Sequence, residues 1–186
     1  MLKRTLLVVL SFVSLVILAP YVVEAVPTIS APSVTVGVGD AFTIPISITG
    51  ATDLTSWQFD LAFNPAILQA NLVSEGPFMS SFGTTLFTPG VIDNGTGLIS
   101  LVADSYVDIP PNPSGSGVLA NIDFLAFAPG VSPLTFSNVF LNLSGQGFEI
   151  VNGQTTAVPE PATMILLASG LGFLGMRRLS RRGRQE

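Results

Sequence analysis

The sequence predicts an all-β protein in which residues 26–158 form a two-layer antiparallel sandwich. Apolar and polar residues alternate with a period of two in several short runs, as they do in half-buried strands. Glycine, proline, asparagine and aspartate separate these runs. No stretch of this region keeps the 3.6-residue period of an amphipathic helix over three turns. We therefore expect about nine or ten short strands.

Two runs carry the clearest alternation. Every second residue is Phe or Ile in residues 42–48, and Trp, Phe or Leu in residues 57–63. These side chains are expected to face the core, Trp57 among them. Pro45 cannot donate a backbone hydrogen bond, which predicts an edge strand or a bulge there. The segment PPNPSGSG, residues 110–117, predicts a surface loop.

The N-terminus has the three-part pattern of a secretory signal peptide. Two basic residues precede an apolar run over residues 6–19, and small residues end the segment at Ala25. We expect a signal helix in residues 1–25, with cleavage between Ala25 and Val26. The chain has no cysteine, so a domain exported in this way must be stable without disulfides.

The distribution of charge excludes several function classes. All seven Lys and Arg residues lie in the first four and last ten positions, whereas residues 26–158 hold nine acidic residues and no Lys, Arg or His. Nucleic-acid binding is excluded because it depends on basic contacts to phosphates. Catalysis by His, Cys or Lys is excluded as well. A carboxylate pair of the glycosidase type remains, but no acidic pair lies in such a pattern, so we expect no enzyme.

Four segments carry a family resemblance in their order along the chain. They are GDAFTIPISITG, SWQFDLAFNPAILQANLVSEG, GLISLVADS and SGSGVLANIDFLAF. In this order they resemble the cohesin family. The resemblance implies a nine-stranded antiparallel jelly-roll sandwich over residues 26–157, a fold shared with several carbohydrate-binding modules.

The same resemblance suggests a partner-binding strand. Cohesins that bind dockerins carry polar contacts on the third strand, and the matching positions here are Ser56 and Gln58. Asp60 lies on the same predicted face, and Tyr106 is the single tyrosine of residues 26–158. These four residues are the candidate contacts for a dockerin-like protein or an exopolysaccharide. Plain solvent-facing polar residues are the alternative.

Calcium is the one cofactor that the acidic surplus suggests, and otherwise we expect none. Calcium prefers carboxylate and carbonyl oxygens. Asp93, Asp104 and Asp108 lie in or beside segments that read as loops. However, no EF-hand spacing is present, and Asp93-Asn94-Gly95 is first of all a turn signal.

The C-terminal segment combines a proline motif, an apolar run and a basic cluster. Pro159, Glu160 and Pro161 enforce an extended junction. The next fifteen residues, 162–176, are uncharged and would rise about 23 Å as a helix, against about 30 Å of hydrocarbon in a bilayer. A basic cluster follows at Arg177, Arg178, Arg181, Arg182 and Arg184. We expect a short transmembrane helix with this cluster in the cytoplasm.

With these three parts in this order, residues 158–186 resemble a PEP-CTERM sorting signal. The resemblance implies transient anchoring, cleavage near Pro159-Glu160-Pro161 by an exosortase-type protease, and release to the cell surface or extracellular matrix. A permanent membrane anchor is the alternative. The sequence thus predicts an exported, non-catalytic surface or biofilm-matrix protein, with a dockerin-binding cohesin or a carbohydrate-binding module as the alternatives.

Overall fold

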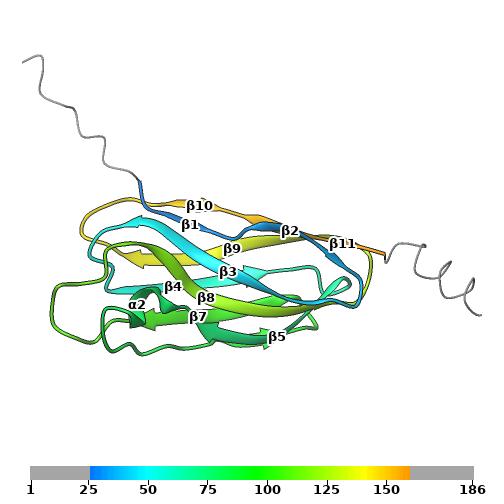
Figure 1. The fold of residues 1–186 in the computed structure, drawn as a ribbon, viewed down its shortest axis with the longest axis horizontal. Coiled ribbons are helices and arrows are strands. Elements are labelled where there is room, and N and C mark those ends of the chain that lie inside the picture. Colours follow the sequence, from blue (N-terminus) through cyan, green and yellow to red (C-terminus); the bar gives the residue numbers. More distant parts are fainter. Residues whose placement is uncertain (1–25, 160–186) are drawn as a thin grey trace, which may run out of the picture.

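A computed structural model describes residues 26–159, in which two β-sheets pack face to face (Figure 1). This part contains eleven strands and one four-residue helix, α2 (Pro77–Ser80). The strands are β1 (Thr28–Ser30), β2 (Ser33–Gly37), β3 (Ala41–Ala51), β4 (Ser56–Ala62), β5 (Leu68–Glu75), β6 (Val91–Asp93), β7 (Leu98–Ser105), β8 (Gly115–Ala126), β9 (Gly130–Asn142), β10 (Glu149–Val151) and β11 (Gly153–Val158). Several sequence predictions lie outside the described residues: the signal peptide with Ala25, the residues Glu160 and Pro161, the transmembrane helix and the basic cluster. Among the described residues, no helix is long and apolar enough to cross a membrane.

The predicted all-β sandwich is confirmed. One sheet has the strand order β10-β1-β3-β8-β5, and the other has the order β2-β11-β9-β4-β7-β6. The prediction of nine antiparallel strands is wrong in two respects. The described part has eleven strands, and two pairs, β1 with β10 and β2 with β11, are parallel, so both sheets are mixed.

Both differences come from the two ends of the domain. The N-terminal segment passes from the first sheet to the second at Ala31 and Pro32, so one extended segment forms β1 and then β2. The C-terminal segment crosses in the same way at Asn152 and forms β10 and then β11. These two segments run side by side in the same direction, which makes their contacts parallel.

The core confirms the predicted alternation. The inward side chains of β3 and β4 are almost fully buried, and they are Ile44, Ile46, Ile48, Trp57, Phe59 and Leu61. At Pro45 strand β3 has a partner only in β8, because β1 pairs no farther than Ser47, and a register shift follows Ile46. The expected bulge is thus found next to Pro45, whereas β3 is an inner strand that lacks a second partner only along its first half. The predicted loop 110–117 is shorter than expected, because β8 already begins at Gly115.

Candidate functional site

Strand β4 lies in the middle of the six-stranded sheet, between β9 and β7. Its side chains alternate as predicted: Ser56, Gln58 and Asp60 are half-buried on the outer surface, and the residues between them are buried. Gln58 lies opposite Phe140 of β9 and Ala103 of β7. Cross-strand partners share a face of the sheet, so Phe140 also points outward.

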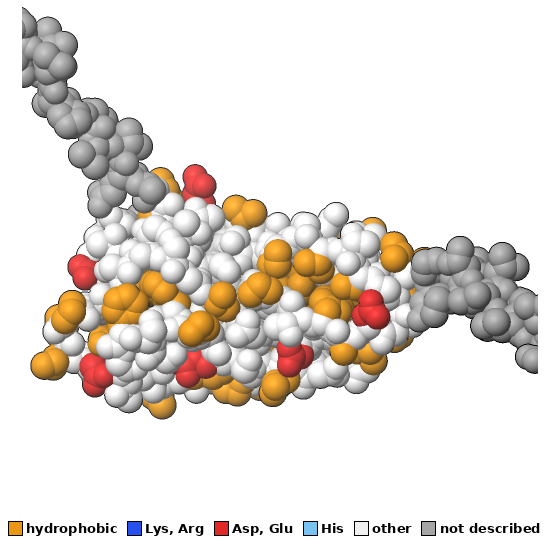
Figure 2. Space-filling model, viewed as in Figure 1, with side chains coloured by type: hydrophobic (Ala, Val, Ile, Leu, Met, Phe, Trp, Pro, Cys, Tyr) orange, Lys and Arg blue, Asp and Glu red, His pale blue; other side chains and the backbone are white. Residues whose placement is uncertain are grey.

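Two exposed apolar side chains flank these polar residues. Phe140 in β9 is 55 % exposed, and Leu101 in β7 is 51 % exposed. We refer to the outer surface formed by Ser56, Gln58, Asp60, Leu101 and Phe140 as the β4 face. It offers hydroxyl and amide groups between two apolar side chains, and Asp60 provides its one charge. No Lys or Arg occurs in the described residues, and none is visible in Figure 2.

Both apolar side chains are placed outward by β-bulges. In β7, Ser100 and Leu101 lie opposite the single residue Asp60, and in β9 two residues, Asn138 and Val139, lie opposite Phe59. Each bulge inserts one residue and so reverses the faces of the residues beyond it. Strict alternation from Ile99 or from Phe136 would have turned Leu101 and Phe140 inward. Sequence reasoning missed both residues for this reason.

Asp60 joins the two bulges through its carboxylate. Its Oδ1 accepts a hydrogen bond from the backbone N–H of Leu101 at 2.7 Å, and its Oδ2 accepts one from Asn138 Nδ2 at 2.6 Å. Leu101 and Asn138 both have positive φ angles, 57° and 49°. Positive φ angles are uncommon in residues other than glycine, although Asn adopts them more readily than most. They persist only when the surrounding structure supports them. Asp60, a predicted partner contact, therefore supports the shape of the β4 face with both oxygens.

We expect Asp60→Ala to lower the free energy of unfolding by about 1–3 kcal/mol, because it removes the acceptor from two donors at strained positions. Asp123→Ala is the matched control: Asp123 is half-buried like Asp60, but its carboxylate accepts only one side-chain bond, from Thr43 Oγ1. That change should cost under about 0.5 kcal/mol. Urea denaturation of both variants measures the difference. Equal stability of the two variants would show that Asp60 is free for a partner.

The aromatic candidates do not form an exposed sugar platform. Trp57 is 1 % exposed, as the sequence predicted. Tyr106 is half-buried beside the end of β7 rather than free in a loop. Its hydroxyl donates a hydrogen bond to the carbonyl of Phe82 at 3.2 Å. Tyr106 thus follows Ser105, the partner of Ser56, but its hydroxyl is bonded to the segment around Phe82.

The three calcium candidates are not brought together. Within residues 26–159 no group of three or more acidic side chains is placed to hold a metal ion. Asp93 ends β6, Asp104 is buried in β7, and Asp108 Oδ2 accepts a hydrogen bond from the N–H of Thr84. Each carboxylate instead has a role in the fold.

Asp93 shows the turn that its sequence motif indicates. Its Oδ1 accepts hydrogen bonds from the N–H groups of Gly95 at 2.8 Å and Thr96 at 3.2 Å. Hydrogen bonds from the Thr96 side chain, and then from these two N–H groups, lower the pKa of Asp93. The side chain of Asn94 pairs with both backbone groups of Ala70, which ties this turn to β5.

Asp104 lies on the inner face of β7 and is only 2 % exposed. Burial, and then the negative charge of Glu75, raise the pKa of its carboxyl to about 6. The N–H of Ser105 donates to its Oδ1 at 2.8 Å, which partly opposes this shift. The sequence placed Asp104 beside a loop, so the buried carboxyl was not foreseen.

A family model of the cohesin domain matches residues 27–155, which is nearly all of the described chain. The chain belongs to the cohesin family. The model of the PEP-CTERM protein-sorting motif matches residues 157–184, so the sorting motif directly follows the cohesin domain. Both resemblances inferred from the sequence are thereby confirmed. No curated protein matches the chain.

Solved cohesin structures share this fold. The non-cellulosomal cohesin of the archaeon Archaeoglobus fulgidus superimposes with a TM-score of 0.59 at 20% identity, covering 75% of this chain and 96% of its own. The third ScaC cohesin of Acetivibrio cellulolyticus, solved with the ScaB dockerin, gives 0.59 at 14%, covering 71% and 99%. The Clostridium thermocellum complex Coh-OlpA–Doc918 gives 0.57 at 14%, covering 72% and 100%. At these identities the likeness establishes the fold.

Proposed function

We propose that this protein is an exported, non-catalytic cohesin that binds a dockerin-like protein through the β4 face. The supporting observation is the pair of exposed apolar side chains on this face, Phe140 opposite Gln58 and Leu101 beside Asp60. Exposed aromatic side chains contribute much of the affinity of protein interfaces, and hydrogen-bonding groups such as those between Phe140 and Leu101 add direct contacts to a partner. Two of the similar cohesins were solved in complexes with dockerins.

The two terminal segments determine where the protein is expected to act. Residues 1–25 act as the signal peptide, and residues 162–176 hold the precursor in the membrane with the arginine cluster in the cytoplasm. An exosortase-type protease then cleaves near Pro159 and releases the domain to the cell surface or matrix. The family match over residues 157–184 supports this route.

The chemistry of the domain supports binding rather than catalysis. Residues 26–158 contain no His, Cys, Lys or Arg, so they lack imidazole and amine bases, thiol nucleophiles and cationic clamps. Affinity must come from apolar contact and uncharged hydrogen bonds. The acidic surface favours partners that are neutral or basic.

The test compares two leucines of similar exposure on opposite sheets. Leu101 lies on the β4 face, and Leu72, which is 54 % exposed, lies on β5 of the other sheet. The wild-type domain is used to capture a protein from the producer's surface fraction, which is identified and purified. We expect Leu101→Asp to weaken binding of that protein by about 10- to 100-fold, and Leu72→Asp by less than about 2-fold.

Two outcomes would contradict the proposal. One is an equal loss of affinity in both leucine variants, or a larger loss with Leu72→Asp. The other is capture of polysaccharide without protein, which would favour a carbohydrate-binding module. Asp tolerates a positive φ better than Leu does, so Leu101→Asp is not expected to disturb the bulge.

A further inference from the structure

The chain leaves the sandwich with almost no spacer before its apolar run. Val158 ends β11 opposite Gly37, and its carbonyl accepts a hydrogen bond from the N–H of Val38 at 2.8 Å. The apolar run begins at Ala162, four residues farther along the sequence. Four extended residues span at most about 14 Å. The end of the sandwich is therefore held close to any membrane that takes up the run.

The length of the apolar run tightens this limit. As a helix, residues 162–176 rise about 23 Å, so the run and the link together reach about 37 Å. The hydrocarbon core and one headgroup layer together measure about 35–38 Å. With Arg177 at the inner boundary of the hydrocarbon, Val158 reaches only the outer limit of the headgroups. Arginine snorkelling relaxes this by a few ångströms, whereas helix tilt or a bend in the link draws the sandwich closer.

Three exposed apolar side chains lie at this end. Phe127, Val131 and Val158 are 48 %, 49 % and 40 % exposed. Phe127 follows β8, and Val131 lies opposite Thr156 of β11, two residues before Val158. We call the surface formed by these three residues the C-terminal end of the sandwich. Hydrophobic side chains are visible beside the point where the described chain ends (Figure 2).

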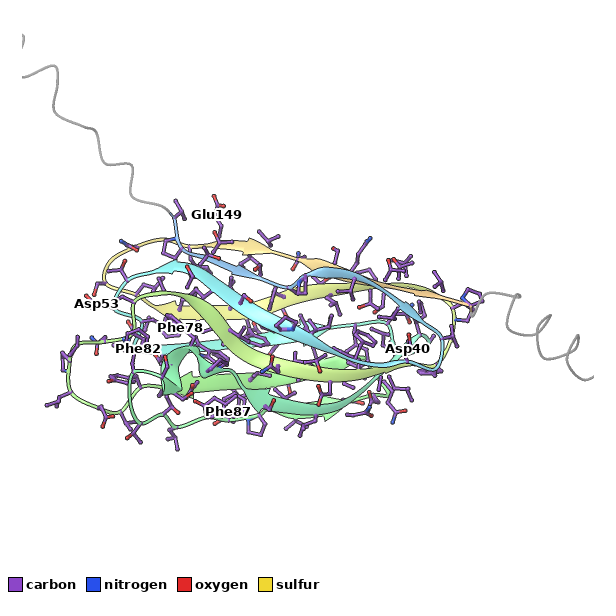
Figure 3. The ribbon with its side chains drawn as sticks, in the orientation of Figure 1. Asp40, Asp53, Phe78, Phe82, Phe87 and Glu149 are labelled. Carbon is purple, nitrogen blue, oxygen red and sulfur yellow. The ribbon has the colours of Figure 1, made fainter. Side chains whose placement is uncertain are left out.

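The acidic residues near this end do not prevent contact with lipid. Asp40 and Asp93 lie at this end, whereas Asp53 and Glu149 lie toward the opposite end (Figure 3). The Asp93 carboxylate accepts hydrogen bonds from the N–H groups of Gly95 and Thr96 in its own turn. Asp40 Oδ2 accepts a hydrogen bond from the N–H of Gly37 at 2.7 Å, so this carboxylate is bonded within the turn that joins β2 to β3. Because the described residues include no Lys or Arg, contact must depend on apolar insertion rather than on anionic lipids.

We propose that in the membrane-anchored precursor the C-terminal end of the sandwich rests in the lipid headgroup layer, with Phe127, Val131 and Val158 against lipid. This inference rests on the proposed function, because it requires residues 162–176 to be inserted. The domain therefore stands upright on the membrane, with the segment that joins β7 to β8 at its far end. Cleavage near Pro159 releases the domain from this contact.

The absence of cysteine allows a clean test with single-cysteine labels in the full chain. Phe127→Cys and Ile109→Cys each receive an environment-sensitive fluorophore. Ile109 is 86 % exposed and precedes Gly115, the start of β8, whose twelve residues separate the two ends by about 36 Å. Each variant is reconstituted in phosphatidylcholine vesicles that carry nitroxide headgroups. We expect several-fold stronger quenching at position 127 than at position 109.

The outcomes separate the two proposals. If the full chain does not float with the vesicles, the membrane anchor is wrong and so is the contact. If it floats but the two labels are quenched equally, or neither is quenched, only the lipid contact is wrong. Protection of the label at position 127 that appears only when an exosortase is added would identify this end as a protease contact instead.

Discussion

Phe59→Ala is expected to lower the free energy of unfolding by about 3–5 kcal/mol. Phe59 is completely buried in β4. Its ring stacks on Trp57 with centroids 5.5 Å apart, and it meets the edge of Phe136 at 5.4 Å. Removing it leaves a cavity at the contact between β4 and β9. A domain of this size has about 5–15 kcal/mol of stability, so this single change removes a large part of it.

Phe140→Ala is the matched control. It deletes the same side chain from the neighbouring strand β9, but Phe140 is 55 % exposed, so the loss should stay below about 1 kcal/mol. Urea denaturation of both variants gives the two free energies. A loss below about 1 kcal/mol for Phe59→Ala would mean that the inner face of β4 can rearrange. The domain contains no disulfide, so its stability depends on such contacts.

The alternation of the sequence was enough to predict the layers of the fold. Ile44, Ile46, Trp57 and Phe59 lie where a period of two places them, because a strand buried on one face must alternate. The order of the cohesin-like motifs predicted the general sandwich architecture. What the pattern could not show was how the two terminal segments divide between the sheets. The sequence of β11, GQTTAV, looks like a surface segment because it is polar. In the structure, however, its inward residue Thr155 is fully buried.

The candidate site was harder to predict because it depends on two bulges. A bulge changes the face of every later residue in its strand, and the sequence GLISLVADS carries no signal for one. Counting by twos from Ile99 turns Leu101 inward and Asp104 outward, whereas the structure has the reverse. One inserted residue therefore explains both an exposed leucine and a buried carboxyl.

The bulges also connect the predicted and the unforeseen residues of the β4 face. Asp60 was predicted as a partner contact from its position on the strand. That prediction stands, and the structure adds that its carboxylate holds the two bulge positions, Leu101 and Asn138, that accompany the outward Leu101 and Phe140 side chains. We therefore expect replacement of Asp60 to show its first effect in the stability of the domain.

Asp104→Asn is expected to raise the free energy of unfolding at pH 7 by about 1–3 kcal/mol. Burial, and then the negative charge of Glu75, raise the pKa of Asp104 from its usual 3.8 to about 6. Its cross-strand neighbour Trp57 does not offset this, because the buried indole Nε1 has no hydrogen-bond partner among the described residues. The folded protein must therefore hold a poorly solvated carboxylate at neutral pH.

The sign of the pH dependence follows from proton binding. Between about pH 4 and pH 6 the folded state keeps the Asp104 proton while the unfolded state has lost it, so stability falls as the pH rises through this window. Above about pH 6 both states are ionised and the loss is complete. One pKa unit corresponds to about 1.4 kcal/mol, which sets the upper end of the range. Asparagine stays neutral and can still accept the hydrogen bond from the N–H of Ser105. The unfolding free energy of the variant should therefore not fall with pH in this window.

The control for this prediction is Asp93→Asn. The pKa of Asp93 is lowered in the folded state, so its contribution is present at neutral pH and is lost only as the pH falls below the usual range of a carboxyl. This variant should keep the wild-type slope between about pH 4 and pH 6, whereas Asp104→Asn should remove it. Urea denaturation across this range measures both slopes. If Asp104→Asn retains the wild-type slope, the buried carboxyl of Asp104 is not the cause of the pH dependence.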